Sequence, residues 1–235
     1  MADSLKRTIL ITGGSRGIGR EIATKMAEDG HTVFVTSRSA EKLDDLKKRF
    51  PDSLHPIESD LSNQNEVNKV VDSVTANASS LDVLINNAGS LINKPFKDTS
   101  DEDWYAQLEC NLMAPVRLIR SLLGLMKPGS HIVNIGSMGG FQGSSKFAGL
   151  AAYSVSKGGL SLLTECLSAE FVEQGVAVNC LCLGAVQTEM LNAAFPGLKA
   201  PVNPPEMADF INNFALNGQN FFNGKVLPVS LADPK

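Results

Sequence analysis

The sequence predicts an α/β protein with a doubly wound, mostly parallel sheet of seven strands and helices on both faces. Short apolar runs rich in β-branched residues alternate with segments of helical periodicity along most of the chain. These runs are mostly apolar, as in parallel strands that are buried on both faces. With 235 residues and no evident linker or repeat, the chain is expected to form one domain over residues 1–235.

The expected elements follow one another in regular order. Strands are predicted over residues 8–12, 32–36, 54–59, 81–85, 131–135, 176–183 and 226–229. Helices are predicted over residues 18–28, 40–50, 67–74 and 153–173, with a long helix that opens at Ser100. Gly30 is placed to end the first helix and Ser39 to cap the second. Ser100 and Asp103 match a capping box, and residues 193–205 are expected to form a loop or lid.

Composition argues against several classes of function. A net charge of −4 disfavours nucleic acid or an anionic membrane as the main partner. No apolar run approaches the roughly 20 residues that cross a bilayer, and the polar start is not typical of a signal peptide. The four cysteines form no CxxC pair and the three histidines are scattered, so we expect no metal site. Buried, reduced thiols and a cytoplasmic location are the remaining expectation.

A glycine-rich turn, TGGSRGIG at residues 12–19, links the first strand to the first helix. Glycines let the backbone turn tightly and approach a pyrophosphate, which the N–H groups at the next helix N-terminus attract. Glycines also make turns that bind nothing. The position between a first strand and a helix is nevertheless typical of the dinucleotide-binding Rossmann fold.

Further motifs follow in a fixed order. Asp60-Leu61 comes after the third strand, Asn86-Asn87-Ala88-Gly89 after the fourth and Ser137 after the fifth, while residues 153–157 read YSVSK. Each alone fits a plain turn or a cap. Together, over residues 8–190, they make the chain resemble the short-chain dehydrogenase/reductase family, in its single-domain branch similar to 3-oxoacyl-carrier-protein reductases. The resemblance implies a Rossmann-type dinucleotide-binding and catalytic domain.

The resemblance also implies which residues contact a nicotinamide cofactor. Those outside the strand-two region are Gly13, Ser15, Arg16, Gly17, Ile18, Gly19, Asp60, Leu61, Asn86, Asn87, Ala88, Gly89, Tyr153, Lys157, Val186 and Thr188.

By the same resemblance, Asn111, Ser137, Tyr153 and Lys157 form a catalytic tetrad. Tyr153 and Lys157 are four residues apart and so face one side of a helix. A tyrosine ordinarily has a pKa of about 10, and a neighbouring ammonium favours the phenolate, so Lys157 is expected to lower the pKa of Tyr153. The family gives Tyr153 the proton transfer, Lys157 the nicotinamide ribose, and Ser137 a hydrogen bond to the substrate oxygen.

Asn111 has a further feature. Pro115 lies four residues later and has no N–H, so the main-chain carbonyl of Asn111 loses its usual helical partner. Such a carbonyl can hold a water beside Lys157, in a proton relay that resembles the family's. The alternative is that Pro115 only bends the helix.

The end of strand two bears on the choice of cofactor. Residues 36–39 read TSRS, with no acid before Glu41. An NAD enzyme places a carboxylate here to bind the ribose hydroxyls. Ser37 and Arg38 instead offer donors to a 2′-phosphate, and Arg16 can approach it from the other side. Each arginine alone fits a solvated surface charge, but together they predict NADP(H).

The sequence therefore predicts an NADPH-dependent oxidoreductase that reduces a small carbonyl substrate (a ketone, an aldehyde or a 3-oxoacyl thioester) by hydride transfer. Two alternatives remain open: an NAD-linked alcohol dehydrogenase, and a cofactor-sensing scaffold that keeps the fold and has lost turnover. Residues 186–207 are expected to form a substrate loop. Aromatic and leucine side chains suggest an apolar pocket, although they also fit ordinary packing; they are Phe141, Phe147, Leu191, Phe195 and Leu198.

The chain departs from the family pattern in three places. The loop at residues 138–150 is enlarged, Leu183-Gly184 stands where the family has Pro-Gly, and the C-terminus lacks the closing glycine pair. The resemblance implies a homodimer or homotetramer that forms through the helices near residues 101–124 and 153–173. Four leucines suggest apolar surface beyond one helix face; they are Leu118, Leu122, Leu162 and Leu163.

Overall fold

The structure is a computed structural model that describes residues 6–231. Its strands are β1 (Thr8–Ile11), β2 (Thr32–Ser37), β3 (Leu54–Glu58), β4 (Val83–Asn86), β5 (His131–Ser137), β6 (Ala177–Leu183) and β7 (Val226–Val229). They form one sheet in the order β3-β2-β1-β4-β5-β6-β7, and every neighbouring pair is parallel. The predicted fold class is confirmed.

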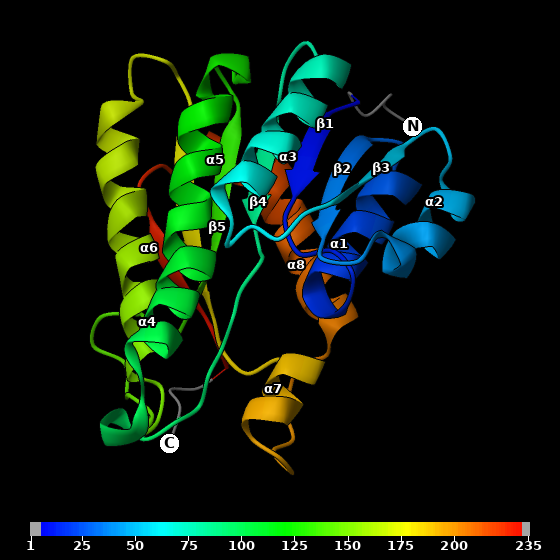
Figure 1. Ribbon diagram of the computed structural model, residues 1–235. Coiled ribbons are helices and arrows are strands. Elements are labelled where there is room, and N and C mark those ends of the chain that lie inside the picture. The colour runs from blue at the N-terminus through cyan, green and yellow to red at the C-terminus, as the bar shows by residue number, and fades with distance from the viewer. Residues whose placement is uncertain (1–5, 232–235) are drawn as a thin grey trace.

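Helices cover both faces of the sheet (Figure 1). They are α1 (Gly17–Glu28), α2 (Asp44–Arg49), α3 (Gln64–Asn77), α4 (Asp101–Leu108), α5 (Ala114–Leu122), α6 (Ala151–Glu170), α7 (Glu189–Ala194) and α8 (Pro204–Asn217). Ile9 and Ile11 of β1 join one apolar cluster with α1 and α8, whereas Leu10 joins a second cluster with α3 and α5. The alternation of side chains along β1 thus builds a core on each face of the sheet.

The strand order positions the ligand-binding edge. Chain order reverses between β1 and β4, which lie side by side although β2 and β3 come between them in sequence. In sheets of this kind the crevice at such a reversal, beyond the carboxyl ends of the strands, receives ligands. In Figure 1 these ends point toward α7. Within residues 6–231, no helix has the length and apolar character needed to cross a membrane.

Two of the predicted helix ends are confirmed. Gly30 adopts φ +80° just after α1, a conformation that glycine tolerates best. Ser100 and Asp103 form a reciprocal capping box at the start of α4. The cap expected at Ser39 is wrong: its side chain makes no cap hydrogen bond, and the expected helix is a 3-10 turn (Ala40–Leu43) followed by α2.

Two other expectations about helices need correction. The long helix from Ser100 is interrupted by a π turn (Glu109–Met113) between α4 and α5, next to Pro115. The loop expected at residues 193–205 is shorter, because α7 reaches Ala194 and α8 begins at Pro204. The sequence reading missed α8 altogether, although Asn203 and Glu206 form a capping box around Pro204.

Of the four leucines expected to provide apolar surface, two are buried in the structure and two are not. Leu118 and Leu122 of α5 are fully buried in the cluster with α3, so they offer no apolar surface. Leu163 is half-buried, and Leu162 of α6 is 61% exposed. The helical period alone did not reveal which side of α5 faces the sheet.

Candidate active site

The glycine-rich turn is held against the end of β4 by the chain's own polar groups. Thr12 Oγ1 accepts hydrogen bonds from the N–H groups of Asn87 (3.0 Å) and Ala88 (2.9 Å). The Asn87 side-chain amide donates back to the carbonyls of Thr12 (2.9 Å) and Gly13 (3.1 Å). Gly13 has φ +73°, and a Cβ there would lie 2.9 Å from the Cα of Ala88. Asn87 and Ala88 thus hold the glycine-rich turn in its conformation by direct contacts with Thr12 and Gly13.

The start of α1 has no capping side chain. Gly17, with φ +54°, opens the helix, and a Cβ at Gly19 would lie 2.3 Å from the carbonyl oxygen of Gly13. Arg16 at the N-cap gives no side-chain cap, and the first turn holds no acid, so no side chain at these positions satisfies the first N–H groups of the helix. The side chain of Ile18 packs against the core.

The end of β4 links this turn to the predicted catalytic residues. The Asn86 side chain is buried and donates to Oδ1 of Asn134 on β5 at 2.8 Å, away from the turn. A Cβ at Gly89 would lie 3.4 Å from Asn111 Oδ1 and 3.7 Å from Lys157 Nζ. Gly89 therefore sits where three parts of the chain converge.

Ser137 and Tyr153 meet at the carboxyl end of β5. Ser137 ends β5, Tyr153 lies in the first turn of α6, and their side chains form a hydrogen bond. The turn after β5 passes so close to α6 that a Cβ at Gly140 would lie 2.6 Å from the Lys157 carbonyl carbon. This close approach brings the two hydroxyl groups together.

Lys157 of α6 is buried against β5. It is 4% exposed, and its ammonium donates to the carbonyl of Ile135 on β5 at 2.7 Å. One turn of α6 separates it from Tyr153, as the spacing predicts.

The fourth residue, Asn111, is fully buried in the π turn. Its side chain accepts from the N–H of Ser90 (2.7 Å) and donates to the Ser90 carbonyl (2.8 Å) and to Ser156 Oγ (2.9 Å). Ser156 in turn donates to the carbonyl of Tyr153 at 2.7 Å. Asn111 thus connects the segment after β4 to the first turn of α6.

Burial controls the protonation of both central groups. Burial raises the pKa of Tyr153, and the hydrogen bond with Ser137 opposes that shift. Burial lowers the pKa of Lys157, because a charged ammonium loses its hydration there. Besides burial, the groups that shift the pKa of Tyr153 are Ser137, which lowers it, and Cys182, which raises it. The lowering of this pKa expected from Lys157 is not seen.

Two buried thiols lie behind Lys157. Cys180 and Cys182 have sulfurs 3.9 Å apart on one face of β6, and each contacts Ser161 Oγ, at 3.7 and 3.6 Å. The hydrogen bond from Cys180 lowers the pKa of Cys182 to about 7. All four cysteines are free, but Cys166 is exposed, so the expectation of uniformly buried thiols is wrong there.

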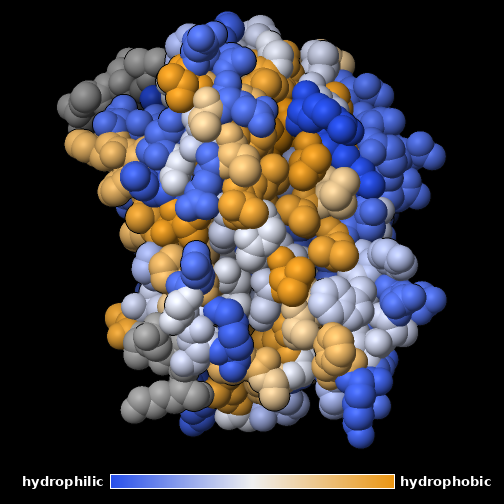
Figure 2. Space-filling model, turned by 90° about the vertical axis from the view of Figure 1, so that its left-hand side faces the viewer, coloured by the Kyte–Doolittle hydropathy of each residue, from blue (hydrophilic) through white to orange (hydrophobic). Residues whose placement is uncertain are grey.

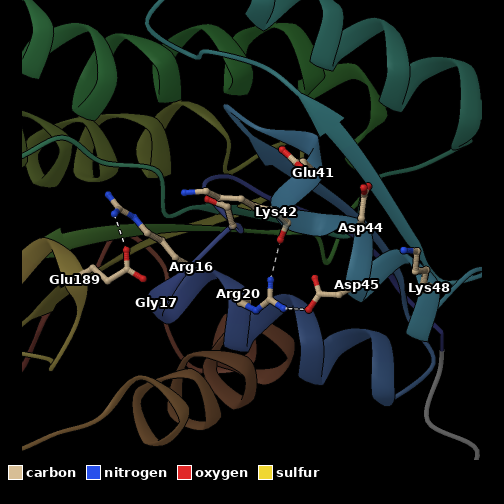
Figure 3. Close-up of a pocket in the computed structure, with 10 residues that line it drawn as sticks. Arg16, Gly17, Arg20, Glu41, Lys42, Asp44, Asp45, Lys48 and Glu189 are labelled. Carbon is tan, nitrogen blue, oxygen red and sulfur yellow. Dashed lines mark hydrogen bonds and ion pairs between the residues drawn. The ribbon is translucent and has the colours of Figure 1, made fainter.

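An open cleft of about 640 Å³ lies beside the glycine-rich turn (Figure 3). One side is formed by the glycine-rich turn and α1, through Ser15, Arg16, Gly17 and Arg20. The other side carries both acids and lysines, namely Glu41, Lys42, Asp44, Asp45 and Lys48. Arg16 Nη1 forms an ion pair with Oε2 of Glu189, the first residue of α7, at 2.7 Å. The cleft therefore joins the glycine-rich turn, the segment after β2 and the start of α7.

The strand-two residues lie outside the cleft lining. Ser37 is buried, and its Oγ accepts from the N–H of Ser39 at 3.1 Å. Arg38 is exposed, and its charge acts on Cys110 together with that of Asp60. Arg38 therefore lies within electrostatic range of Cys110 in the π turn, whereas Arg16 lies in the cleft.

The other predicted cofactor residues lie near the same edge of the sheet. Asp60 is exposed after β3, and Leu61 beside it is buried. Val186 is buried and pairs with Val202, while Thr188 caps the start of α7. A Cβ at Gly17 would lie 3.4 Å from Thr188 Cγ2, so the start of α7 touches the glycine-rich turn.

The enlarged loop at residues 138–150 approaches α7. The rings of Phe147 and Phe195 lie 6.0 Å apart, and the carbonyl of Gly149 accepts from the N–H of Lys94 at 2.9 Å. Phe141 instead packs against Met138 and the buried thiols, which is ordinary packing. Of the five side chains proposed for a pocket, Phe147 and Phe195 are thus brought together.

Sequence reasoning missed two residues of this region. Ser156 links Asn111 to Tyr153. It follows Tyr153 by three residues, and this helical spacing could have indicated from the sequence that the two lie close together. Lys42 lines the cleft with Arg16, but only the tertiary structure reveals it, since the sequence does not say which way a surface lysine points.

Comparison with known proteins agrees with this geometry. The model of the short chain dehydrogenase family matches residues 7–199. The 3-oxoacyl-(acyl-carrier-protein) reductase FabG of Aquifex aeolicus is 29% identical over 94% of each chain.

Two solved structures are also similar. A short chain dehydrogenase from Burkholderia cenocepacia in complex with NADP has a TM-score of 0.86 at 26% identity, over 95% of this chain and 96% of that one. A 4-hydroxyisoleucine dehydrogenase mutant complexed with NADH and succinate has a TM-score of 0.85 at 26% identity, over 95% and 97%. The chain belongs to the short-chain dehydrogenase family and is an oxidoreductase with a nicotinamide-cofactor fold.

Proposed function

We propose that this oxidoreductase uses NADPH to reduce a carbonyl to an alcohol, with Tyr153 as the proton donor. The observation that carries the proposal is the hydrogen-bonded pair of Ser137 and Tyr153, with the buried ammonium of Lys157 one turn of α6 away from Tyr153. A substrate oxygen placed between the two hydroxyls would receive a hydrogen bond from Ser137 and a proton from Tyr153. When bound, the nicotinamide cofactor supplies the hydride.

The protonation of Tyr153 suits the role of proton donor. Burial raises its pKa, so the phenol carries a proton at neutral pH.

The chain also carries the groups that a dinucleotide needs. The free N–H groups at the start of α1 suit a pyrophosphate, and we assign the nicotinamide ribose to Lys157. Asn111 is fixed by Ser90 and Ser156, and Pro115 offers its carbonyl no N–H. We propose that the main-chain carbonyl of Asn111 binds a water molecule, and that Lys157 exchanges protons with solvent through this water.

Residues 186–207 are assigned to the substrate. They include α7, which touches the glycine-rich turn through Thr188, and Phe195, which faces Phe147 of the enlarged loop. We propose that these two rings form an apolar wall over the reacting carbonyl. The cytoplasmic location expected from the sequence and the one-domain organisation belong to the same proposal.

A panel of carbonyl compounds tests the function. Small ketones, aldehydes, 3-oxoacyl thioesters, quinones and steroids are mixed with the protein, and consumption of NADPH is followed by absorbance. We expect turnover with at least one class. Tight binding of NADPH without turnover of any class would favour a cofactor-sensing scaffold instead.

Arg38 is the first test of cofactor choice. We expect the wild type to prefer NADPH over NADH, and Arg38→Asp to reverse the order, because a carboxylate repels a 2′-phosphate and accepts from ribose hydroxyls. The measurement is kcat/KM for both cofactors in both proteins. A wild-type ratio near one, or a ratio that the substitution leaves unchanged, would show that Arg38 does not read the phosphate.

We further propose a homodimer or homotetramer that forms through the α4 and α6 surface. Figure 2 shows apolar side chains gathered over much of the face on the α6 side of the molecule. Tyr105 of α4 is 65% exposed, and Val155 and Leu162 of α6 are 54% and 61% exposed. Such a concentration of exposed apolar groups is typical of an interface.

Light scattering at micromolar concentration measures the assembly. We expect a mass of two or four times 25.0 kDa, and a shift toward the monomer in Leu162→Arg, since a buried arginine there would lack a partner. A wild-type mass of 25.0 kDa would refute the assembly.

A further inference from the structure

The cleft beside the glycine-rich turn contains two cations without a partner. Arg16 is paired with Glu189, and Arg20 is paired with Asp45. Within residues 6–231, by contrast, the ammonium groups of Lys42 and Lys48 take part in no ion pair or hydrogen bond, although the acids Glu41 and Asp44 line the same cleft. An exposed lysine without a partner is ordinary on a flat surface, but these two line the cleft that begins at Ser15, Arg16 and Gly17.

The backbone of Lys42 is nevertheless fixed. Arg20 of α1 donates from Nη1 to the Lys42 carbonyl at 2.9 Å, which ties the 3-10 turn after β2 to α1. Figure 3 shows the Lys42 side chain extending from that turn toward Arg16, while Lys48 lies at the far end of the cleft. The ammonium of Lys42 is therefore aimed at the glycine-rich turn by contacts that do not involve its charge.

Glu189 introduces competition for Arg16. The Arg16–Glu189 ion pair joins residues 173 positions apart, and both side chains are about half exposed, with 46% and 65% of their surface accessible. Such exposed pairs are weak, so a stronger anion can displace the carboxylate. A phosphate monoester carries between about 1.5 and 2 negative charges at neutral pH and offers three acceptor oxygens, which suits it to that exchange.

We propose that Lys42 is a further specificity-determining residue for the 2′-phosphate of NADP(H), acting beside Arg16, and that Glu189 competes with this phosphate for Arg16. The proposal rests on the proposed function, because it takes NADP(H) as the cofactor. Lys42 distinguishes the phosphate from the free hydroxyl of NAD(H), since only the phosphate carries charge there. Arg16 leaves Glu189 and turns its guanidinium fork to the same phosphate.

Binding of adenosine nucleotides tests the proposal without turnover. The full chain is titrated by calorimetry with 2′,5′-ADP, which carries the 2′-phosphate, and with 5′-AMP, which lacks it. For Lys42→Gln we expect affinity for 2′,5′-ADP to fall about tenfold with little change for 5′-AMP, the scale of one lost charge-assisted hydrogen bond. For Glu189→Gln we expect affinity for 2′,5′-ADP to rise about threefold, as a weak exposed ion pair no longer competes.

Lys48→Gln is the matched control. It removes the same charge from the lining of the same cleft, but at the end away from Arg16, so we expect both affinities to stay close to wild type. Equal losses in Lys42→Gln and Lys48→Gln would contradict the assignment of Lys42, since they would report only net charge. If Glu189→Gln binds 2′,5′-ADP with unchanged affinity, Glu189 does not compete with the 2′-phosphate for Arg16.

The 5′-AMP titration separates this proposal from the function on which it rests. Normal 5′-AMP binding with unchanged 2′,5′-ADP binding in Lys42→Gln overturns the role of Lys42 and leaves the NADPH-dependent function standing. Failure of the wild type to bind either nucleotide contradicts both.

Discussion

Replacement of Tyr153 by Phe is expected to lower kcat by at least about 100-fold, the usual scale for loss of a general acid, while NADPH binding stays near wild type. Phenylalanine keeps the ring in place in the first turn of α6 and removes only the hydroxyl that bonds to Ser137. Binding of NADPH is measured by fluorescence titration, and turnover with the best substrate of the carbonyl panel.

The chain supplies its own control for this substitution. Its other tyrosine, Tyr105, lies on α4 and is 65% exposed, away from Ser137 and Lys157. Tyr105→Phe removes the same atom and should leave kcat close to wild type. A rate near wild type in Tyr153→Phe would assign proton donation to another group.

Replacement of Lys157 by Met should damage both cofactor binding and turnover. Methionine has a similar length and suits a buried site, but it removes the ammonium that donates to the Ile135 carbonyl and is assigned to the nicotinamide ribose. We expect NADPH affinity to fall about tenfold and kcat about 100-fold, because one charged donor serves both binding and proton exchange.

The effect on stability of Lys157→Met should be small by comparison. Loss of the partner of the Ile135 carbonyl costs about 1–3 kcal/mol, whereas removal of a buried charge relieves its desolvation, so the two effects oppose each other. A thermal unfolding scan separates a lost function from a lost fold. The exposed Lys69 of α3 provides the control, and a Lys157→Met variant that binds NADPH as well as Lys69→Met would contradict the assignment.

The sheet could be predicted from sequence because its signal is local and redundant. The runs that contain Leu10, Ile85 and Val133 are mostly apolar, as expected of strands that are covered on both faces. Helix boundaries depend on tertiary contacts, so Ser39 looked like a cap and is not one. Leu118 and Leu122 show the same limit, because the orientation of α5 is decided by packing against α3.

The candidate site was predictable where residues are tied to a strand end or a helix turn. Ser137 at the end of β5 and Tyr153 in the first turn of α6 lie together because of the topology. Interactions between distant segments were not predictable. The pairing of Arg16 with Glu189 and the approach of Lys42 to the glycine-rich turn depend on how α7 and the turn after β2 fold against α1.

Hydride transfer itself can be followed with a label. NADPH that carries deuterium at the transferable position of the nicotinamide is incubated with the protein and a carbonyl from the panel, and the product is examined by mass spectrometry and NMR. We expect an alcohol with one deuterium on the former carbonyl carbon, formed by the wild type and at least about 100-fold more slowly by Tyr153→Phe. An alcohol without deuterium, or equal rates in the two proteins, would contradict carbonyl reduction by hydride transfer with Tyr153 as the proton donor.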